Sequence, residues 1–106
     1  EQDGLLARAE ELGRRLLERG RTWQKRFPFI GEVRGLGAMV AMELVEADKA
    51  PASERAARVL KRCYERGLIL LKAGAGANVL RFLMPLSIAW EELDEGLDVL
   101  EAVLSE

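Results

Sequence analysis

The sequence predicts an α+β domain in which about three helices pack on one small, largely antiparallel sheet. Three stretches with apolar residues at helical spacing alternate with short stretches of β type, without an internal repeat or a flexible linker. The length of 106 residues fits one compact domain and leaves no room for a second. With 49% hydrophobic and 32% charged residues, the composition is that of a globular protein. We therefore expect residues 1–106 to fold around a single core.

The first helix is predicted from Leu5 onward. Arginines and glutamates occupy one side, and the apolar side consists of Leu5, Ala9, Leu12 and Leu16, widened by Leu6 and Leu17. Two ends are compatible with this pattern. The helix either stops near Gly20 or continues through Trp23 and Phe27 to the boundary before Pro28.

A stretch punctuated by glycines, residues 30–37, precedes an apolar run over residues 38–45, and together they predict a strand or a hairpin. Both sides of the run are apolar apart from Glu43: one side carries Met39, Ala41 and Val45, and the other Val40, Met42 and Leu44. A strand that is apolar on both faces is covered on both faces. Since three helices can cover one face of the sheet, we expect the other face to meet a partner surface that this chain lacks.

A second helix is predicted to begin at the segment Pro51, Ala52 and Ser53, with Ser53 as its N-cap, and to stop before Gly67. Its apolar face consists of Ala56, Val59, Leu60 and Cys63. Residues 68–71 then predict a buried strand that runs into the loop 73–77.

Residues 78–83 predict another strand, closed by Pro85. A third helix follows, with Leu93, Leu97, Leu100 and Leu104 on one face. Its acidic residues are interpreted as helix-start and solubility residues, because carboxylates favourably oppose the helix dipole; they are Glu91, Glu92, Asp94 and Glu95.

The composition excludes several classes of function. The chain has no histidine and one cysteine, Cys63, so the familiar zinc patterns, Ser-His or Cys-His pairs and an internal disulfide cannot be built. Its 16 basic and 18 acidic residues give a net charge of -2 and are spread along the helices, so we do not expect nucleic acid as a partner. No apolar run approaches the ~20 residues that span a membrane. We expect a cytoplasmic protein with no membrane partner.

The glycine pairs are interpreted as tight turns. A dinucleotide-binding loop leaves a strand and opens a helix, whereas the segment after Gly35 and Gly37 is predicted to be a strand, and the same objection applies to Gly74 and Gly76. We interpret Cys63, on the apolar face of the second helix, as a small core residue. We expect no metal site.

Arg81 is the candidate binding residue. Strand alternation puts it on the same face as Val79 and Leu83, within an apolar segment. A guanidinium there needs an anionic partner, and arginine grips a carboxylate through two parallel charge-assisted hydrogen bonds. From the residues alone, two interpretations stay open: a structural ion pair with a local glutamate such as Glu43, or a site for a ligand carboxylate.

Four segments resemble, in order and spacing, the C-terminal part of class III pyridoxal-phosphate (PLP) aminotransferases: IGEVRGLGAM (30–39), RGLILL (66–71), NVLRFLMPL (78–86) and LDEGL (93–97). The third is most similar to 4-aminobutyrate aminotransferases. The resemblance implies that residues 1–106 are the C-terminal small domain of an enzyme that transfers an amino group from an ω-amino acid to 2-oxoglutarate. It also implies that Arg81 aligns with the arginine that holds a substrate carboxylate.

The same resemblance implies that the PLP-binding large domain is absent from this chain. In that family the Schiff-base lysine, the phosphate-binding residues and the aspartate facing the pyridine nitrogen lie upstream. The lysines of this chain match no part of the PLP-lysine motif; they are Lys25, Lys49, Lys61 and Lys72. We expect that the chain alone neither binds PLP nor turns over substrate, and that the full-length parent forms a homo-oligomer. The absence of an initial methionine also suggests a piece of a longer protein.

Two departures from the family leave the donor open. Ala89 stands where relatives often carry a capping hydroxyl or acid, so the third helix is expected to fray at its start, and the loop over residues 72–77 lacks distinctive side chains. One alternative is a domain of an acetylornithine or ornithine aminotransferase. Another is a free-standing α+β module that binds small ligands or proteins through its exposed sheet face.

Overall fold

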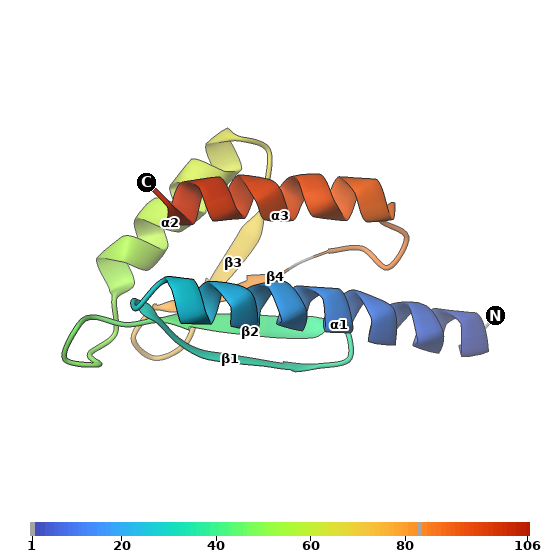
Figure 1. The fold of residues 1–106 in the computed structure, drawn as a ribbon, viewed down its shortest axis with the longest axis horizontal. Coiled ribbons are helices and arrows are strands. Elements are labelled where there is room, and N and C mark those ends of the chain that lie inside the picture. The colour runs from blue at the N-terminus through green and yellow to red at the C-terminus, as the bar shows by residue number, and fades with distance from the viewer. Residues whose placement is uncertain (1, 83) are drawn as a thin grey trace.

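The computed structural model describes residues 2–82 and 84–106. Within these residues an α+β fold is formed by three helices and four strands, which confirms the predicted fold class (Figure 1). In chain order the elements are α1 (Gln2–Arg26), β1 (Ile30–Leu36), β2 (Met39–Leu44), α2 (Ser53–Glu65), β3 (Leu70–Ala73), β4 (Val79–Phe82) and α3 (Trp90–Leu104).

The sheet has the strand order β1-β2-β4-β3, and every neighbouring pair described is antiparallel. It consists of two hairpins, β1-β2 and β3-β4, joined by the pairing of β2 with β4. The β2–β4 pairing brings together residues that are far apart in the sequence, because Ala41 lies opposite Arg81. Arg81 therefore lies on an inner strand, with neighbours on both sides.

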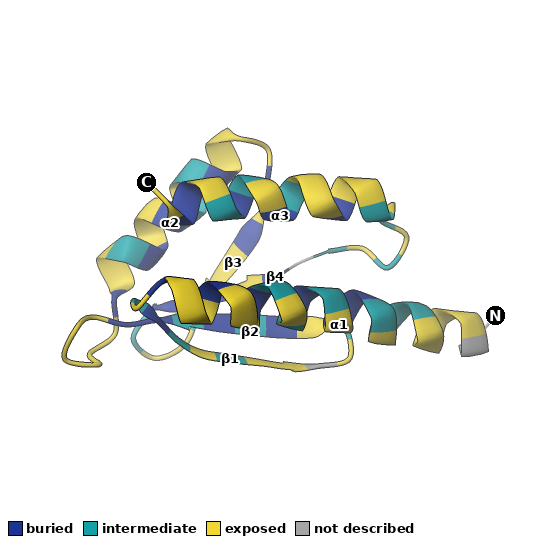
Figure 2. Ribbon diagram, in the orientation of Figure 1, coloured by how far each residue is buried: buried dark blue, intermediate teal, exposed yellow. Residues whose placement is uncertain are grey.

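One core fills the space between the sheet and the helices, as Figure 2 shows by the buried positions that face inward. The strands contribute alternate residues, and those of β2 are Val40, Met42 and Leu44. Their partners from the helices include Leu12, Leu16 and Trp23 of α1, Val59 and Cys63 of α2, and Leu93, Leu97 and Leu100 of α3. The helices thus cover one face of the sheet. The other face is open at Met39, whose side chain is 62% exposed.

Helix α1 takes the longer of its two predicted courses and ends at Arg26. The decisive residue is Trp23, which is completely buried and whose Nε1–H donates a hydrogen bond of 2.7 Å to the Glu101 carboxylate of α3. Burying an aromatic ring of this size outweighs the weak helix propensity of Gly20. Before Trp23 in the same helix, Arg19 forms an ion pair with Asp98 of α3 at 2.9 Å.

Two predicted boundaries are wrong. Ser53 is the first helical residue of α2 rather than its N-cap, and the cap is Ala52, which has no side-chain hydrogen bond to offer. The reason is a tertiary contact. The Ala52 N–H donates a hydrogen bond to the Leu44 carbonyl, and this bond makes Ala52 the residue at which the helix begins. The strand β3 begins at Leu70 rather than at residue 68, since the Leu68 N–H still donates to the Cys63 carbonyl at the end of α2.

The strand predicted over residues 78–83 forms as Val79–Phe82, while Leu83 lies outside the described residues. Helix α3 begins after Ala89, which offers no side-chain cap. Glu92 supplies part of the missing contact, because its carboxylate accepts a hydrogen bond of 3.2 Å from the Ala89 N–H. The residues described contain no helix with the length and apolar character needed to cross a membrane.

The predicted core position of Cys63 is confirmed, and burial raises the pKa of its thiol to about 11. The native chain at pH 8 is expected to react with a thiol reagent on the order of 100-fold more slowly than the unfolded chain, because thiolate is the reactive form. Since the folded thiol holds its proton more tightly, its contribution to stability is present below about pH 9 and is lost as the pH rises towards about 11. Equal rates in native and unfolded chain would contradict this burial.

Candidate functional site

Arg81 projects from β4 on the face of the sheet that the helices leave open. Its strand neighbours, Leu80 and Phe82, are buried in the core, whereas Arg81 is exposed. The alternation predicted from the sequence therefore holds in this strand, and Val79 shares the face of Arg81 as expected. The predicted companion Leu83 lies outside the described residues.

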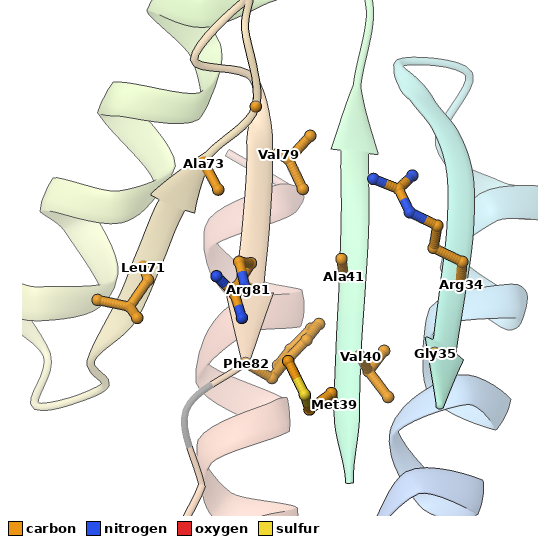
Figure 3. A pocket seen from close by; sticks show the side chains of 11 residues that line it. Arg34, Gly35, Met39, Val40, Ala41, Leu71, Ala73, Val79, Arg81 and Phe82 are labelled. Atoms are coloured by element: carbon orange, nitrogen blue, oxygen red, sulfur yellow. The ribbon is translucent and has the colours of Figure 1, made fainter. Parts of the chain in front are cut away.

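Strand register places four residues in one row across the open face. Arg34 of β1 is opposite Ala41 of β2, Ala41 is opposite Arg81 of β4, and Arg81 is opposite Leu71 of β3. Residues opposite each other in an antiparallel sheet point to the same face. The two guanidinium-bearing strands are therefore separated only by β2 with its small Ala41 side chain, as Figure 3 shows.

A hollow of about 520 Å³ lies over this row. Its polar side chains are the two arginines, and the rest of its lining is apolar or glycine: Gly35, Met39, Val40, Ala41, Leu71, Ala73, Gly74, Val79 and Phe82. Apolar pockets with a small number of charged groups are typical of ligand sites. The hollow can therefore accommodate a small molecule that carries an anionic group on an apolar chain.

The loop between β3 and β4 closes one end of the hollow. Gly74 has φ +88, and a Cβ atom added to it would lie 2.9 Å from Cγ2 of Val79. This close approach buries Val79 although it lies on the open face. Gly37 and Gly74 both adopt the positive φ of tight turns, which confirms the turn interpretation for these two glycines, whereas Gly35 lies within the strand β1.

The nearby carboxylates of the described residues form no ion pair with Arg81. In the described part of the chain, no ion pair joins Arg81 to an acidic side chain. Glu43, the partner considered from the sequence, instead accepts a hydrogen bond of 3.3 Å from the Glu32 N–H on β1. The Glu32 carboxylate pairs with Arg34 at 3.2 Å. Of the two arginines at the hollow, Arg81 is thus the one whose charge these local acids leave available.

The model of the family described as aminotransferase class III matches residues 1–104. The chain belongs to the class III aminotransferase family. A probable 4-aminobutyrate aminotransferase of Bacillus subtilis is 42% identical to it over 106 residues, which cover 98% of this chain and 24% of the relative. A 5-aminovalerate aminotransferase of Pseudomonas aeruginosa is 43% identical over 108 residues, which cover 100% of this chain and 25% of the relative. The chain spans about a quarter of the length of these curated relatives.

The same fold occurs in the solved structures of an aminotransferase and of a phospholyase. A Bacillus anthracis aminotransferase superimposes with a TM-score of 0.87 at 31% identity, covering 98% of this chain and 25% of the other. A phospholyase from Arthrobacter, solved with phosphoethanolamine, has a TM-score of 0.91 at 29% identity, covering 99% and 25%. The small antiparallel sheet with helices on one face is therefore a class III aminotransferase architecture.

Class III aminotransferases depend on PLP, which such enzymes hold with a Schiff-base lysine and with an acidic residue or arginine facing the pyridine nitrogen. Among residues 2–82 and 84–106, the lysines do not fit that role. Its lysines are all exposed, and none lines the hollow beside Arg81; they are Lys25, Lys49, Lys61 and Lys72. Lys61 and Lys72 share a second hollow of about 280 Å³, whose lining includes neither an acidic residue nor an arginine.

Two polar residues that contact the chain on either side of β4 escaped sequence reasoning. Asn78 is buried just before β4, and its side-chain N–H donates a hydrogen bond of 2.8 Å to the Leu44 carbonyl at the end of β2. An amide at the first position of an apolar strand was a usable signal for it. Arg8 of α1 donates to the carbonyls of Leu86 and Ile88. No local pattern indicates that contact, because its partners are 78 and 80 residues away.

Proposed function

We propose that this chain is the C-terminal small domain of a PLP-dependent aminotransferase and that Arg81 binds the carboxylate of its substrates. The observation that carries the proposal is an available guanidinium beside an otherwise largely apolar hollow on an open sheet face. A planar guanidinium can bind both carboxylate oxygens at once, which fixes the orientation as well as the position of the ligand.

The shape of the site suits an ω-amino acid. Such a molecule has a carboxylate at one end, an amine at the other and methylene groups between them. Arg81 would hold the carboxylate while apolar residues such as Val79, Leu71 and Phe82 contact the methylene chain. We therefore infer that the amino donor is a compound like 4-aminobutyrate, with 2-oxoglutarate as the acceptor. Relatives bearing the names 4-aminobutyrate and 5-aminovalerate aminotransferase support this choice.

The remaining parts of the active site would come from the large domain of the parent enzyme. That domain would supply the PLP-binding lysine, since the lysines of this chain do not fit the role. It would also cover the open face of the sheet, where Met39 and Leu71 are 62% and 44% exposed. We further propose that the parent is a cytoplasmic homo-oligomer.

Amino-donor profiling of the full-length parent tests the substrate proposal. We expect 4-aminobutyrate and 5-aminovalerate to react with 2-oxoglutarate at a kcat/KM at least about tenfold above that of N-acetylornithine or ornithine, because the extra α-acetamido or α-amino group of these two donors would be buried against a mostly apolar lining. The matched control is α-alanine, which places the amine next to the carboxylate. A clear preference for N-acetylornithine or ornithine would replace the proposed donor with the alternative one. A parent without aminotransferase activity on any of these donors would refute the enzyme assignment.

A further inference from the structure

The segment that follows the Arg81 strand is held by an arginine from the far end of the chain. Arg8 of α1 donates a hydrogen bond of 2.8 Å from Nε to the Leu86 carbonyl, and its Nη2 donates to the Ile88 carbonyl. Both acceptors belong to the connection between β4 and α3, and the Ile88 N–H closes a turn onto the Pro85 carbonyl within it. One half-buried guanidinium thus binds two main-chain carbonyls of a connection that forms neither helix nor strand over residues 84–89.

The end of the same connection is fixed by stacking. The guanidinium carbon of Arg8 lies 3.6 Å from the ring centroid of Trp90, and that of Arg15 lies 4.0 Å from it. Trp90 is the first residue of α3. Arg15 is held in turn by Glu11, whose carboxylate accepts a hydrogen bond of 2.7 Å from its Nε. Two arginines of α1 therefore fix the place where the connection enters α3.

The charges around this contact persist over the pH range in which an aminotransferase would work. The hydrogen bonds that Glu11 accepts from Arg14 and Arg15 lower the pKa of its carboxyl group to about 2. Arg8 itself contacts main-chain carbonyls and an indole ring, which do not titrate in this range. The contact is therefore not expected to change with pH in this range.

We infer that Arg8 is a positioning residue for Arg81: it fixes the connection over residues 84–89, and this connection determines where β4 leaves the sheet. The inference rests on the proposed function of Arg81. The strand β4 has four residues and Arg81 is the third, so the backbone that carries it is close to the point where strand pairing ends. A displacement of the connection therefore shifts the guanidinium of Arg81 relative to its ligand.

Arg14 provides a matched control on the same helix. Its guanidinium is exposed and bonds only to Glu11 and Glu18 among the described residues, at 2.7 and 3.0 Å. Exposed pairs of this kind contribute little to stability. Arg14→Ala leaves the described contacts of Arg8 in place, and Glu11 keeps its hydrogen bond to Arg15.

The test measures KM and kcat for the carboxylate donor in the full-length parent, together with hydrogen exchange of residues 84–89. For Arg8→Ala we expect KM to rise about tenfold with little change in kcat. The reason is that a displaced Arg81 binds the carboxylate less tightly in the ground state and in the transition state alike. Exchange over residues 84–89 is expected to speed up while the β1-β2 hairpin keeps its protection, which verifies the fold. Arg8→Lys retains the positive charge and one donor nitrogen, so it should restore part of the affinity. Arg14→Ala should change neither readout.

The outcomes separate this inference from the proposed function. If Arg81→Ala raises KM but Arg8→Ala does not, the positioning role of Arg8 is wrong and the binding role of Arg81 stands. If Arg8→Ala and Arg14→Ala raise KM equally, the effect comes from the charge of α1 and the inference is again overturned. If Arg81→Ala leaves KM unchanged, the proposed function fails, and the inference fails with it. If the Arg8→Ala variant does not fold, the KM of the Arg8→Lys variant decides. A KM above that of the original enzyme supports the inference, and an unchanged KM overturns it.

Discussion

Arg81→Ala in the full-length parent is expected to raise KM for carboxylate substrates, with a loss of about 2–4 kcal/mol in transition-state binding. This corresponds to a decrease in kcat/KM of roughly 30-fold to several hundred-fold. The physical reason is the loss of a charge-assisted, two-point contact inside a hollow whose other groups are mostly apolar and cannot replace it. Steady-state kinetics with a varied amino donor measures the effect.

Two further variants show whether the geometry or only the charge of Arg81 matters. Arg81→Lys keeps the positive charge but loses the planar guanidinium. We therefore expect a decrease in kcat/KM that is smaller than for Arg81→Ala but still measurable. Arg34→Ala removes the other arginine of the same row, which already pairs with Glu32. The decrease in kcat/KM for Arg34→Ala should be the smallest of the three. Unchanged kinetics in Arg81→Ala would exclude Arg81 from the substrate site.

Gly13→Ala is expected to destabilise the 106-residue chain by about 3 kcal/mol, the cost of forcing extra volume into a packed interior. Gly13 lies in the middle of α1, where alanine normally stabilises a helix by about 1 kcal/mol relative to glycine. Here an added Cβ would lie 1.7 Å from the carbonyl oxygen of Gly37 in the β1-β2 turn. Since the obstacle is main chain, either the helix or the hairpin must move. Equilibrium denaturation measures the change.

Gly4→Ala is the matched control for this substitution. Gly4 belongs to the same helix, but a Cβ atom there meets nothing within 4 Å. The variant should be as stable as the original chain or up to about 1 kcal/mol more stable, since only helix propensity changes. The opposite signs of the two variants would show that α1 packs backbone to backbone on the hairpin that carries Arg34 and Ala41. A Gly13→Ala chain at least as stable as the original would contradict this packing.

The elements themselves could be predicted from the sequence because periodicity and turn residues act locally. The boundaries of an element could not be predicted where a contact with a residue distant in the sequence determines them. Trp23 extends α1 because α3 offers Glu101 to its indole N–H, and Ala52 starts α2 because Leu44 accepts a hydrogen bond from its main chain. In both places a residue more than five positions away overrides the local preference for Gly20 as a stop or Ser53 as a cap.

The candidate site divides in the same way. Strand alternation predicted that Val79 shares the face of Arg81 and that Leu80 and Phe82 lie on the opposite face, and a family resemblance gave Arg81 its proposed role. The row of Arg34, Ala41, Arg81 and Leu71 depends on the register of three strand pairs, which no local pattern specifies. The sequence also left open an ion pair between Arg81 and Glu43. The structure instead places the Glu43 carboxylate against β1, which leaves the guanidinium of Arg81 available.

The most direct test of the central claim compares 4-aminobutyrate with propylamine, which is the same molecule without its carboxylate. The ratio of their kcat/KM values is measured in the full-length parent and in its Arg81→Ala variant, so that one cycle removes each partner of the proposed contact. If Arg81 binds the carboxylate, the preference for 4-aminobutyrate falls by a factor equivalent to about 2–4 kcal/mol, and the rate with propylamine stays nearly constant. A preference that survives the substitution in full would show that another residue binds the carboxylate.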